Sequence, residues 1–177
     1  MLACLQWLGE FQVLACIPLG SSVAAKDLAD LAGVPEEQLL RVARMTATAG
    51  FLHEPEPGFL AHTPLSEPFV TKLVYLDATM FLSQTAAPAA SMMAAATKRN
   101  RLGQGEETAL NLALGIPSVS ETFQSMRQSR PKLQRQWLAL QRCEADREAC
   151  IVELLSQLDW QTLQNAYVVD VSGASVL

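Results

Sequence analysis

Apolar residues recur at helical spacing through most of the first fifty positions of the chain. The pattern predicts three helices, over residues 2–19, 23–31 and 35–49. Gly33 is placed to end the second helix, because glycine adopts the left-handed conformation of a helix terminus without strain. Leu28 and Leu31 are expected on the inner face of that helix, where they would form part of a core.

Two short runs of alternating apolar and polar residues follow, over residues 51–53 and 59–62. They flank a turn rich in proline and glutamate that contains a glycine, an arrangement that predicts a β-hairpin. Helices followed by a hairpin give the order of a winged helix, spanning roughly residues 19–69. His53 and His62 occupy equivalent places on the two strands and could approach each other, but no nearby cysteine or serine completes a catalytic triad. We expect both to be surface or hairpin-packing residues.

From residue 74 onward the pattern is helical again, with a long amphipathic helix predicted over residues 131–155 and a shorter one over 118–126. Residues 75–98 are rich in alanine and methionine, which favours either core packing or a helical dimer interface. The predicted fold class is therefore mainly α: a winged helix-turn-helix with a small β-hairpin, followed by a helical dimerisation region. The predicted domains are an N-terminal helix and winged helix, a helical region that forms a dimer or binds a partner, and a vestigial terminal segment, with bounds 1–72, 73–163 and 164–177.

Composition narrows the classes of protein that this chain can represent. Hydrophobic residues make up 50% of the chain and the mean hydropathy is +0.16, which is high for a soluble monomer and indicates a partner. No stretch of about twenty apolar residues is present, so we expect no membrane segment. The first basic residue is Lys26, which disfavours a signal peptide and predicts an intracellular protein. No cysteine or histidine spacing suggests a metal site.

Charge disfavours a DNA-binding role, although the winged helix itself permits one. The net charge is −5, and the helix over residues 35–49 carries only Arg41 and Arg44 and begins with two glutamates. A DNA-binding winged-helix repressor is therefore the weaker interpretation, and no direct nucleic-acid contact is predicted.

Basic residues gather instead in the second half of the chain. Nine of the thirteen lysines and arginines lie between residues 98 and 147, interspersed with acids. They form either a solvated helix face or an electrostatic contact with an acidic partner. The candidate partner-binding residues are Arg127, Arg130, Lys132, Arg135 and Arg142.

The last residues of the chain resemble the start of a nucleotide-binding domain. An apolar run over residues 167–169 leads through Asp170 to a turn that contains Gly173, as a strand does before a cofactor-binding loop. We interpret this segment as a truncated first strand of a Rossmann-like domain. Ser172 and Ala174 stand where further glycines are expected, so Asp170 and Gly173 are vestigial and no cofactor is predicted.

Several segments together resemble a known family. The winged-helix stretch "VAAKDLADLAGVPEEQLLRVARMTATAGFL", the segment "HTPLSEPF" and the terminal "VVDVSGAS" are similar to plant and fungal small-molecule O-methyltransferases. Segments such as "CLQWLGEFQVLACIPL", "PKLQRQWLAL" and "LDWQTLQNAYVVDV" resemble a narrower group, the methyltransferase-like transcriptional co-activators of fungal aromatic polyketide clusters, which includes the co-regulator of the aflatoxin and sterigmatocystin pathways.

The narrower resemblance implies a protein without catalytic residues that binds a pathway-specific zinc-cluster transcription factor and promotes expression of the cluster. The expected location is the nucleus, with the cytoplasm as a further location. The wider resemblance implies a dimer, so a homo-oligomer is expected. The alternative is the N-terminal fragment of an S-adenosylmethionine-dependent O-methyltransferase that lacks its catalytic domain. In that family the catalytic histidine follows the segment aligned here, so no catalytic residue can be assigned to this chain.

Overall fold

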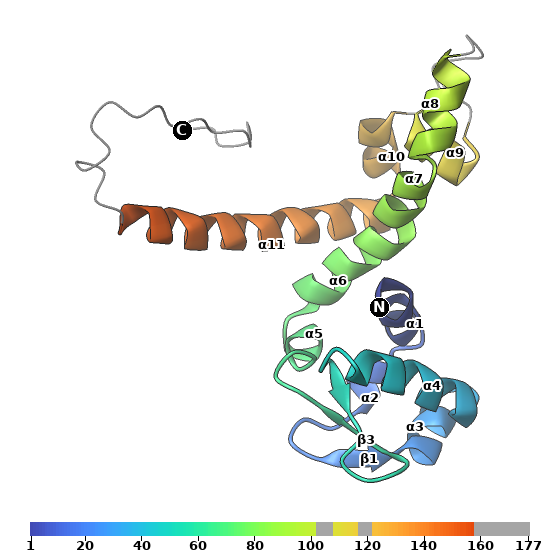
Figure 1. The fold of residues 1–177 in the computed structure, drawn as a ribbon, viewed down its shortest axis with the longest axis vertical. Coiled ribbons are helices and arrows are strands. Elements are labelled where there is room, and N and C mark those ends of the chain that lie inside the picture. The colour runs from blue at the N-terminus through green and yellow to red at the C-terminus, as the bar shows by residue number, and fades with distance from the viewer. Residues whose placement is uncertain (102–107, 117–121, 158–177) are drawn as a thin grey trace. The chain divides into compact units, whose positions relative to one another are not determined.

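The computed structural model describes residues 1–101, 108–116 and 122–157 (Figure 1). Within these residues the chain is mainly helical with one small antiparallel sheet, as the sequence predicts. Two compact units are distinguished, residues 1–143 and residues 144–177. The predicted terminal strand, with Asp170 and Gly173, lies outside the described residues.

The N-terminal apolar segment forms two helices instead of the single predicted one. Helix α1 (Leu2–Glu10) ends before Gln12, whose φ of 53° turns the chain into the short helix α2 (Val13–Cys16). The turn places Val13, Leu14 and Ile17 in the core, each at most 4% exposed. Gln12 therefore takes a left-handed backbone conformation that glutamine rarely adopts, and the turn accompanies the burial of the apolar residues that follow it. Neither a glycine nor a proline stands at this position to signal the turn in the sequence.

A three-stranded sheet follows, in the order β1-β3-β2. Strand β1 (Ser22–Ala24) pairs antiparallel with β3 (Phe59–His62), and β2 (Leu52–His53) pairs with the same strand from its other side. The predicted hairpin is present. Helix α3 (Ala25–Ala32) begins two residues later than predicted, because Val23 and Ala24 extend to pair with β3. Gly33 ends α3 with a φ of 67°, as predicted.

Helix α4 (Glu36–Ala47) packs against α3 and α1, and these helices cover a core with the sheet. The largest fully buried side chains of this core are Leu8, Leu28, Leu39, Leu52 and Leu60. Leu31 was expected on the inner face of its helix, but that expectation is wrong: its side chain is 70% exposed. Two apolar positions three residues apart on α3 therefore have opposite environments.

Residues 68–101, which include the alanine- and methionine-rich segment, form a succession of helices: α5 (Pro68–Thr71), α6 (Leu73–Phe81), the π-helical turn η1 (Leu82–Ala86), α7 (Ala87–Ser91) and α8 (Met93–Arg101). The π-helical turn precedes Pro88, which has no N–H for a helical bond and crowds the carbonyl of Gln84. Met80 is buried, whereas Met92 and Met93 are exposed. The segment therefore contributes to the core at its start and to the surface further along.

Three further helices follow: α9 (Ala109–Leu114), α10 (Phe123–Ser129) and α11 (Pro131–Ser156). Thr108 and Thr122 cap the first two, each side chain accepting a hydrogen bond from the backbone N–H three residues on. Pro131 opens α11 at the first position, where its missing N–H costs nothing. The long helix predicted over 131–155 is confirmed. None of the helices in residues 1–101, 108–116 and 122–157 is long and apolar enough to span a membrane.

Candidate functional site

Three aromatic side chains meet where α6, α10 and α11 come together. The ring centroids of Phe81, Phe123 and Trp137 lie 5.1 to 6.1 Å apart, in edge-to-face arrangements. Such pairs prefer this geometry because the positive edge of one ring faces the negative face of the next. The cluster fixes α10 against the first turns of α11.

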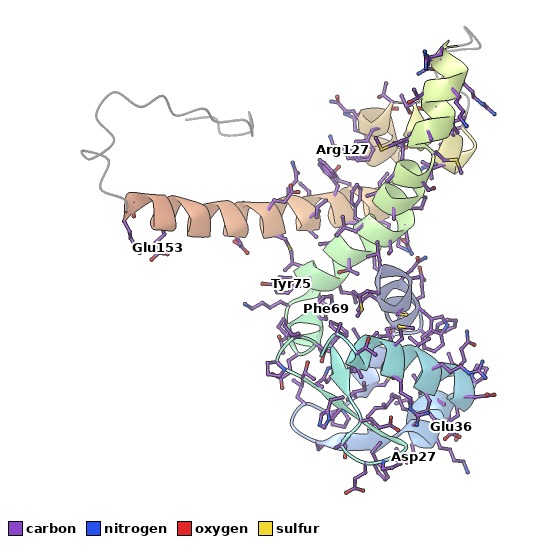
Figure 2. All side chains as sticks on the ribbon, in the orientation of Figure 1. Asp27, Glu36, Phe69, Tyr75, Arg127 and Glu153 are labelled. Atoms are coloured by element: carbon purple, nitrogen blue, oxygen red, sulfur yellow. The ribbon has the colours of Figure 1, made fainter. Side chains whose placement is uncertain are left out.

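Arg127 of α10, labelled in Figure 2, lies over the rings of this aromatic cluster. Its guanidinium carbon lies 5.3 Å from the centroid of Phe123 and 5.4 Å from that of Trp137, both within cation–π range. Its Nε is buried and has no hydrogen-bond partner in the part of the chain that the structure describes. Two aromatic rings therefore flank the charged guanidinium and limit its movement.

A cavity of about 190 Å³ lies next to the aromatic cluster, between α9, α10, α11 and the π-helical turn. Phe123, Met126 and Leu133 form part of its apolar wall, and Arg130 and Lys132 line it as well. No acidic residue lines it among those that the structure describes. Three of the five predicted partner-binding residues, Arg127, Arg130 and Lys132, thus lie in or beside one basic, apolar-walled hollow.

The other two predicted residues have different surroundings. Arg135 makes a two-point ion pair with Asp77 of α6, with Nε to Oδ2 at 2.9 Å and Nη2 to Oδ1 at 3.1 Å. It therefore ties α11 to α6. Arg142 is exposed further along α11 and does not line the cavity. The sequence interpretation missed the aromatic support, although Phe123 and Arg127 stand at the i, i+4 spacing that places two side chains together on a helix.

A second hollow, of about 370 Å³, is bounded by α1, α5, α6 and the start of α11. Leu8, Phe69 and Leu76 are among its apolar walls, and Lys132 and Gln136 line both hollows. Gln136 is 3% exposed, and its Nε2 lies 3.5 Å from Oε1 of Gln84. The Gln84–Gln136 contact therefore lies where the two hollows adjoin.

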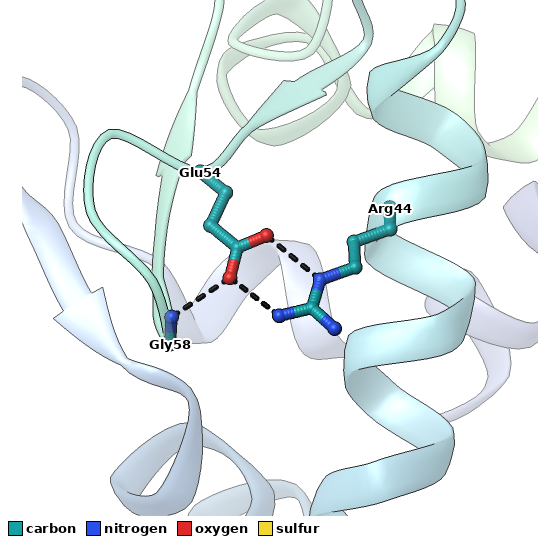
Figure 3. A network of polar contacts seen from close by, with 3 residues as sticks. All are labelled: Arg44, Glu54 and Gly58. Atoms are coloured by element: carbon teal, nitrogen blue, oxygen red, sulfur yellow. Dashed lines mark hydrogen bonds and ion pairs between the residues drawn. The ribbon is translucent and has the colours of Figure 1, made fainter.

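Helix α4 carries an ion pair to the hairpin (Figure 3). Arg44 donates from Nε and Nη2 to the two carboxylate oxygens of Glu54, each at 2.8 Å, and the Gly58 N–H donates to the same carboxylate at 2.7 Å. Arg41 pairs with Glu37 of its own helix. Both arginines of α4 are thus engaged by carboxylates of this chain.

The hydrogen bonds from Arg44 and from the Gly58 N–H lower the pKa of Glu54 to about 2, from an ordinary value of 4.5. The folded protein therefore binds fewer protons at Glu54 than the unfolded chain does between these two values. Stability from this carboxylate is fully present above pH 4.5 and is lost as the pH falls from 4.5 towards 2.

We expect Glu54→Gln to flatten the fall in stability between pH 4.5 and pH 2. Urea unfolding at several pH values measures the free energy of unfolding. The salt concentration is kept low because dissolved ions screen an exposed ion pair. Glu56→Gln is the matched control, since Glu56 is exposed in the same turn. A Glu54→Gln profile parallel to that of the unmodified protein would show that the ion pair contributes nothing to stability.

The two histidines do not face each other across the hairpin. Leu52 lies opposite His62, and His53 lies opposite Ala61, so the two histidines point to opposite faces of the hairpin. His62 Nε2 donates to the carbonyl of Leu14 at 3.1 Å, and its Nδ1 lies 2.8 Å from the buried hydroxyl of Ser66. His62 therefore joins β3 to α2, whereas His53 is exposed. The residues described contain no cluster of three side chains suited to hold a metal ion.

The chain matches no family model, but it is similar to curated proteins over nearly its whole length. It is 56% identical to the monodictyphenone cluster transcriptional coactivator mdpA of Emericella nidulans, over 99% of this chain and 36% of the relative. A transcriptional coactivator of Pseudocercospora fijiensis is 55% identical over 96% of this chain and 46% of the relative. The aflatoxin cluster transcriptional coactivator aflS of Aspergillus flavus is 47% identical over 99% and 40%. The chain thus spans less than half the length of these relatives.

Solved structures share the fold at much lower sequence identity. OxaC, in complex with SAH and oxaline, has a TM-score of 0.66 and is 20% identical, with 79% of this chain and 36% of that chain covered. The mitomycin 7-O-methyltransferase MmcR has a TM-score of 0.61 and is 19% identical, with 79% and 39% covered. The described fold is therefore O-methyltransferase-like, as the sequence resemblance implied.

Proposed function

We propose that this chain is part of a transcriptional coactivator of a fungal secondary-metabolite cluster. Nearly the whole length of the chain is similar to such coactivators. It would promote expression of a gene cluster for an aromatic polyketide. Identities of 47–56% to proteins named as coactivators carry the proposal. Likeness to solved structures, one of them named a methyltransferase, rests on fold at 16–20% identity, and one fold hosts many functions.

The proposed mechanism is protein–protein contact with a zinc-cluster transcription factor, which supplies the sequence-specific DNA contact. Two features support it. Arginines 41 and 44 of α4 are paired with Glu37 and Glu54, so their charge is partly neutralised within the chain. Arg127 and Lys132 lie in or beside a hollow that no described acidic residue lines.

The proposal also covers the role of the winged helix, the oligomeric state and the cellular location of the protein. The segment from β1 to β3 is a winged helix used for packing, which its three-stranded sheet and the helices α3 and α4 support. Exposed apolar side chains, such as Leu73 at 67% and Met93 at 64%, support a homo-oligomer. The site of action would be the nucleus.

Co-purification tests the proposed partner. The tagged chain, expressed with a zinc-cluster factor of an aromatic polyketide cluster from the same genome, should recover that factor. A zinc-cluster factor from an unrelated pathway is the control and should not be recovered. Failure to recover the cluster factor, with the chain folded by circular dichroism, would remove the main support for the mechanism.

The shared fold also favours a second candidate, part of an S-adenosylmethionine-dependent O-methyltransferase. Titration calorimetry separates the two. We expect no heat when S-adenosylmethionine is added to the chain, and micromolar binding would favour the enzyme.

The proposed function also predicts how the chain behaves with duplex DNA. A gel-shift series at increasing salt should show no tight binding, because the α4 arginines are occupied and the hairpin carries Glu54 and Glu56. Tight binding with a steep salt dependence would revive a DNA-binding winged helix.

A further inference from the structure

We propose that the hollow between α9, α10 and α11 binds a short acidic and apolar peptide segment of the partner. Arg127 would receive a carboxylate, and the hollow would take one bulky apolar side chain. This inference rests on the proposed function, since it assigns the contact surface and the chemistry of the partner segment.

The ion pairs of the other arginines support the proposed carboxylate contact at Arg127. Arg41, Arg44 and Arg135 each have a carboxylate partner within the chain. Arg127 has aromatic rings as neighbours, and its buried Nε has no hydrogen-bond partner among the described residues. A carboxylate from another protein would pair with the terminal nitrogens of this half-buried side chain, since the Nε is covered.

Geometry makes Arg127 a suitable receptor. A guanidinium presents its donors in a flat fork that matches the two oxygens of a carboxylate. Packing against Phe123 and Trp137, with the guanidinium carbon 5.3 and 5.4 Å from the two ring centroids, restricts the movement of the side chain before any partner binds. Less side-chain entropy is then lost on binding than for a mobile surface arginine.

The size and lining of the hollow support the proposed binding of one bulky apolar side chain. Its volume of about 190 Å³ equals roughly six water molecules at ~30 Å³ each, which is enough for one leucine or phenylalanine side chain. Pockets for drug-sized ligands and cofactors are larger, about 300–1,000 Å³. Phe123, Met126 and Leu133 provide apolar contact, and Lys132 adds a cation beside them. An acidic residue next to a bulky apolar one would therefore match the surface in both charge and shape.

Fluorescence anisotropy of the full chain with a defined probe tests this site. The probe is a short fluorescein-labelled peptide of aspartates interleaved with leucine and phenylalanine. Arg127→Gln should weaken its binding at least about tenfold, and Lys132→Gln should weaken it less. Arg142→Gln is the matched control: Arg142 is exposed on α11 and absent from the hollow, so binding should stay unchanged.

Changes in the peptide test the site without any change in the protein. Replacing its aspartates by asparagine, or its leucine and phenylalanine by alanine, should each abolish most of the binding. The inference is overturned if Arg127→Gln and Lys132→Gln bind like the unmodified chain, or if the asparagine peptide binds equally well. It is also overturned if duplex DNA displaces the peptide at equal concentration, since the site would then recognise phosphate.

The two proposals can fail separately. Recovery of the zinc-cluster factor by both the unmodified chain and Arg127→Gln would refute the peptide site and leave the proposed function standing. Peptide binding without recovery of any zinc-cluster factor would retain the site and reject the proposed partner.

Discussion

Leu28→Ala is expected to lower the free energy of unfolding by about 2–5 kcal/mol. Leu28 is fully buried on α3, in the core that also contains Leu8 and Leu39. Truncation removes apolar contact and leaves a cavity that the packed helices fill only in part. Urea unfolding followed by circular dichroism measures the change.

Leu31→Ala provides the matched control for this prediction. Leu31 stands three residues further along the same helix, but its side chain is 70% exposed. The same chemical change should alter the free energy of unfolding by less than about 0.5 kcal/mol. Equal losses in the two variants would contradict the orientation of α3. A large loss for Leu31→Ala alone would indicate that Leu31 is covered by another copy or partner.

Trp137→Ala should cost about 3 kcal/mol of stability, because it removes the ring that packs against Phe81 and Phe123. Trp137→Phe should cost less than about 1 kcal/mol, for two reasons. A phenyl ring keeps most of the aromatic contact, and the buried indole Nε1 has no acceptor among the described residues, so its loss removes an unsatisfied donor.

Urea unfolding of both variants checks this difference, and Leu138→Ala is the control. Leu138 is the next residue of α11 and is 40% exposed, so its truncation should cost little. A Trp137→Phe variant as unstable as Trp137→Ala would show that the indole N–H makes an essential bond.

The sequence predicted those parts of the fold that have strong local signals. The long helix α11 and the end of α3 at Gly33 follow from apolar spacing and from a glycine. The break at Gln12 could not be predicted, because the burial of Val13 and Ile17 depends on long-range packing. Strand β1 was missed for a similar reason: three residues carry too little pattern, and pairing with β3 determines their conformation.

The candidate site was predicted only as a charged region. The sequence placed basic residues on the later helices. The structure puts Arg127, Arg130 and Lys132 in or beside one hollow and Arg135 in an ion pair with Asp77. That arrangement depends on contacts between residues far apart in the chain, so residue spacing alone could not reveal it. The aromatic support for Arg127 had a local signal at Phe123, whereas Trp137 is brought there by the packing of α11.

Transcription from a cluster promoter tests coactivation most directly. A reporter behind an aromatic polyketide cluster promoter is placed in yeast with the zinc-cluster factor of that cluster, with and without this chain. Coactivation predicts that the chain raises reporter transcript several-fold when the factor is present and leaves it unchanged when the factor is absent. Reporter transcript that stays at the level of the factor alone, with the chain expressed and folded, would contradict a coactivator function.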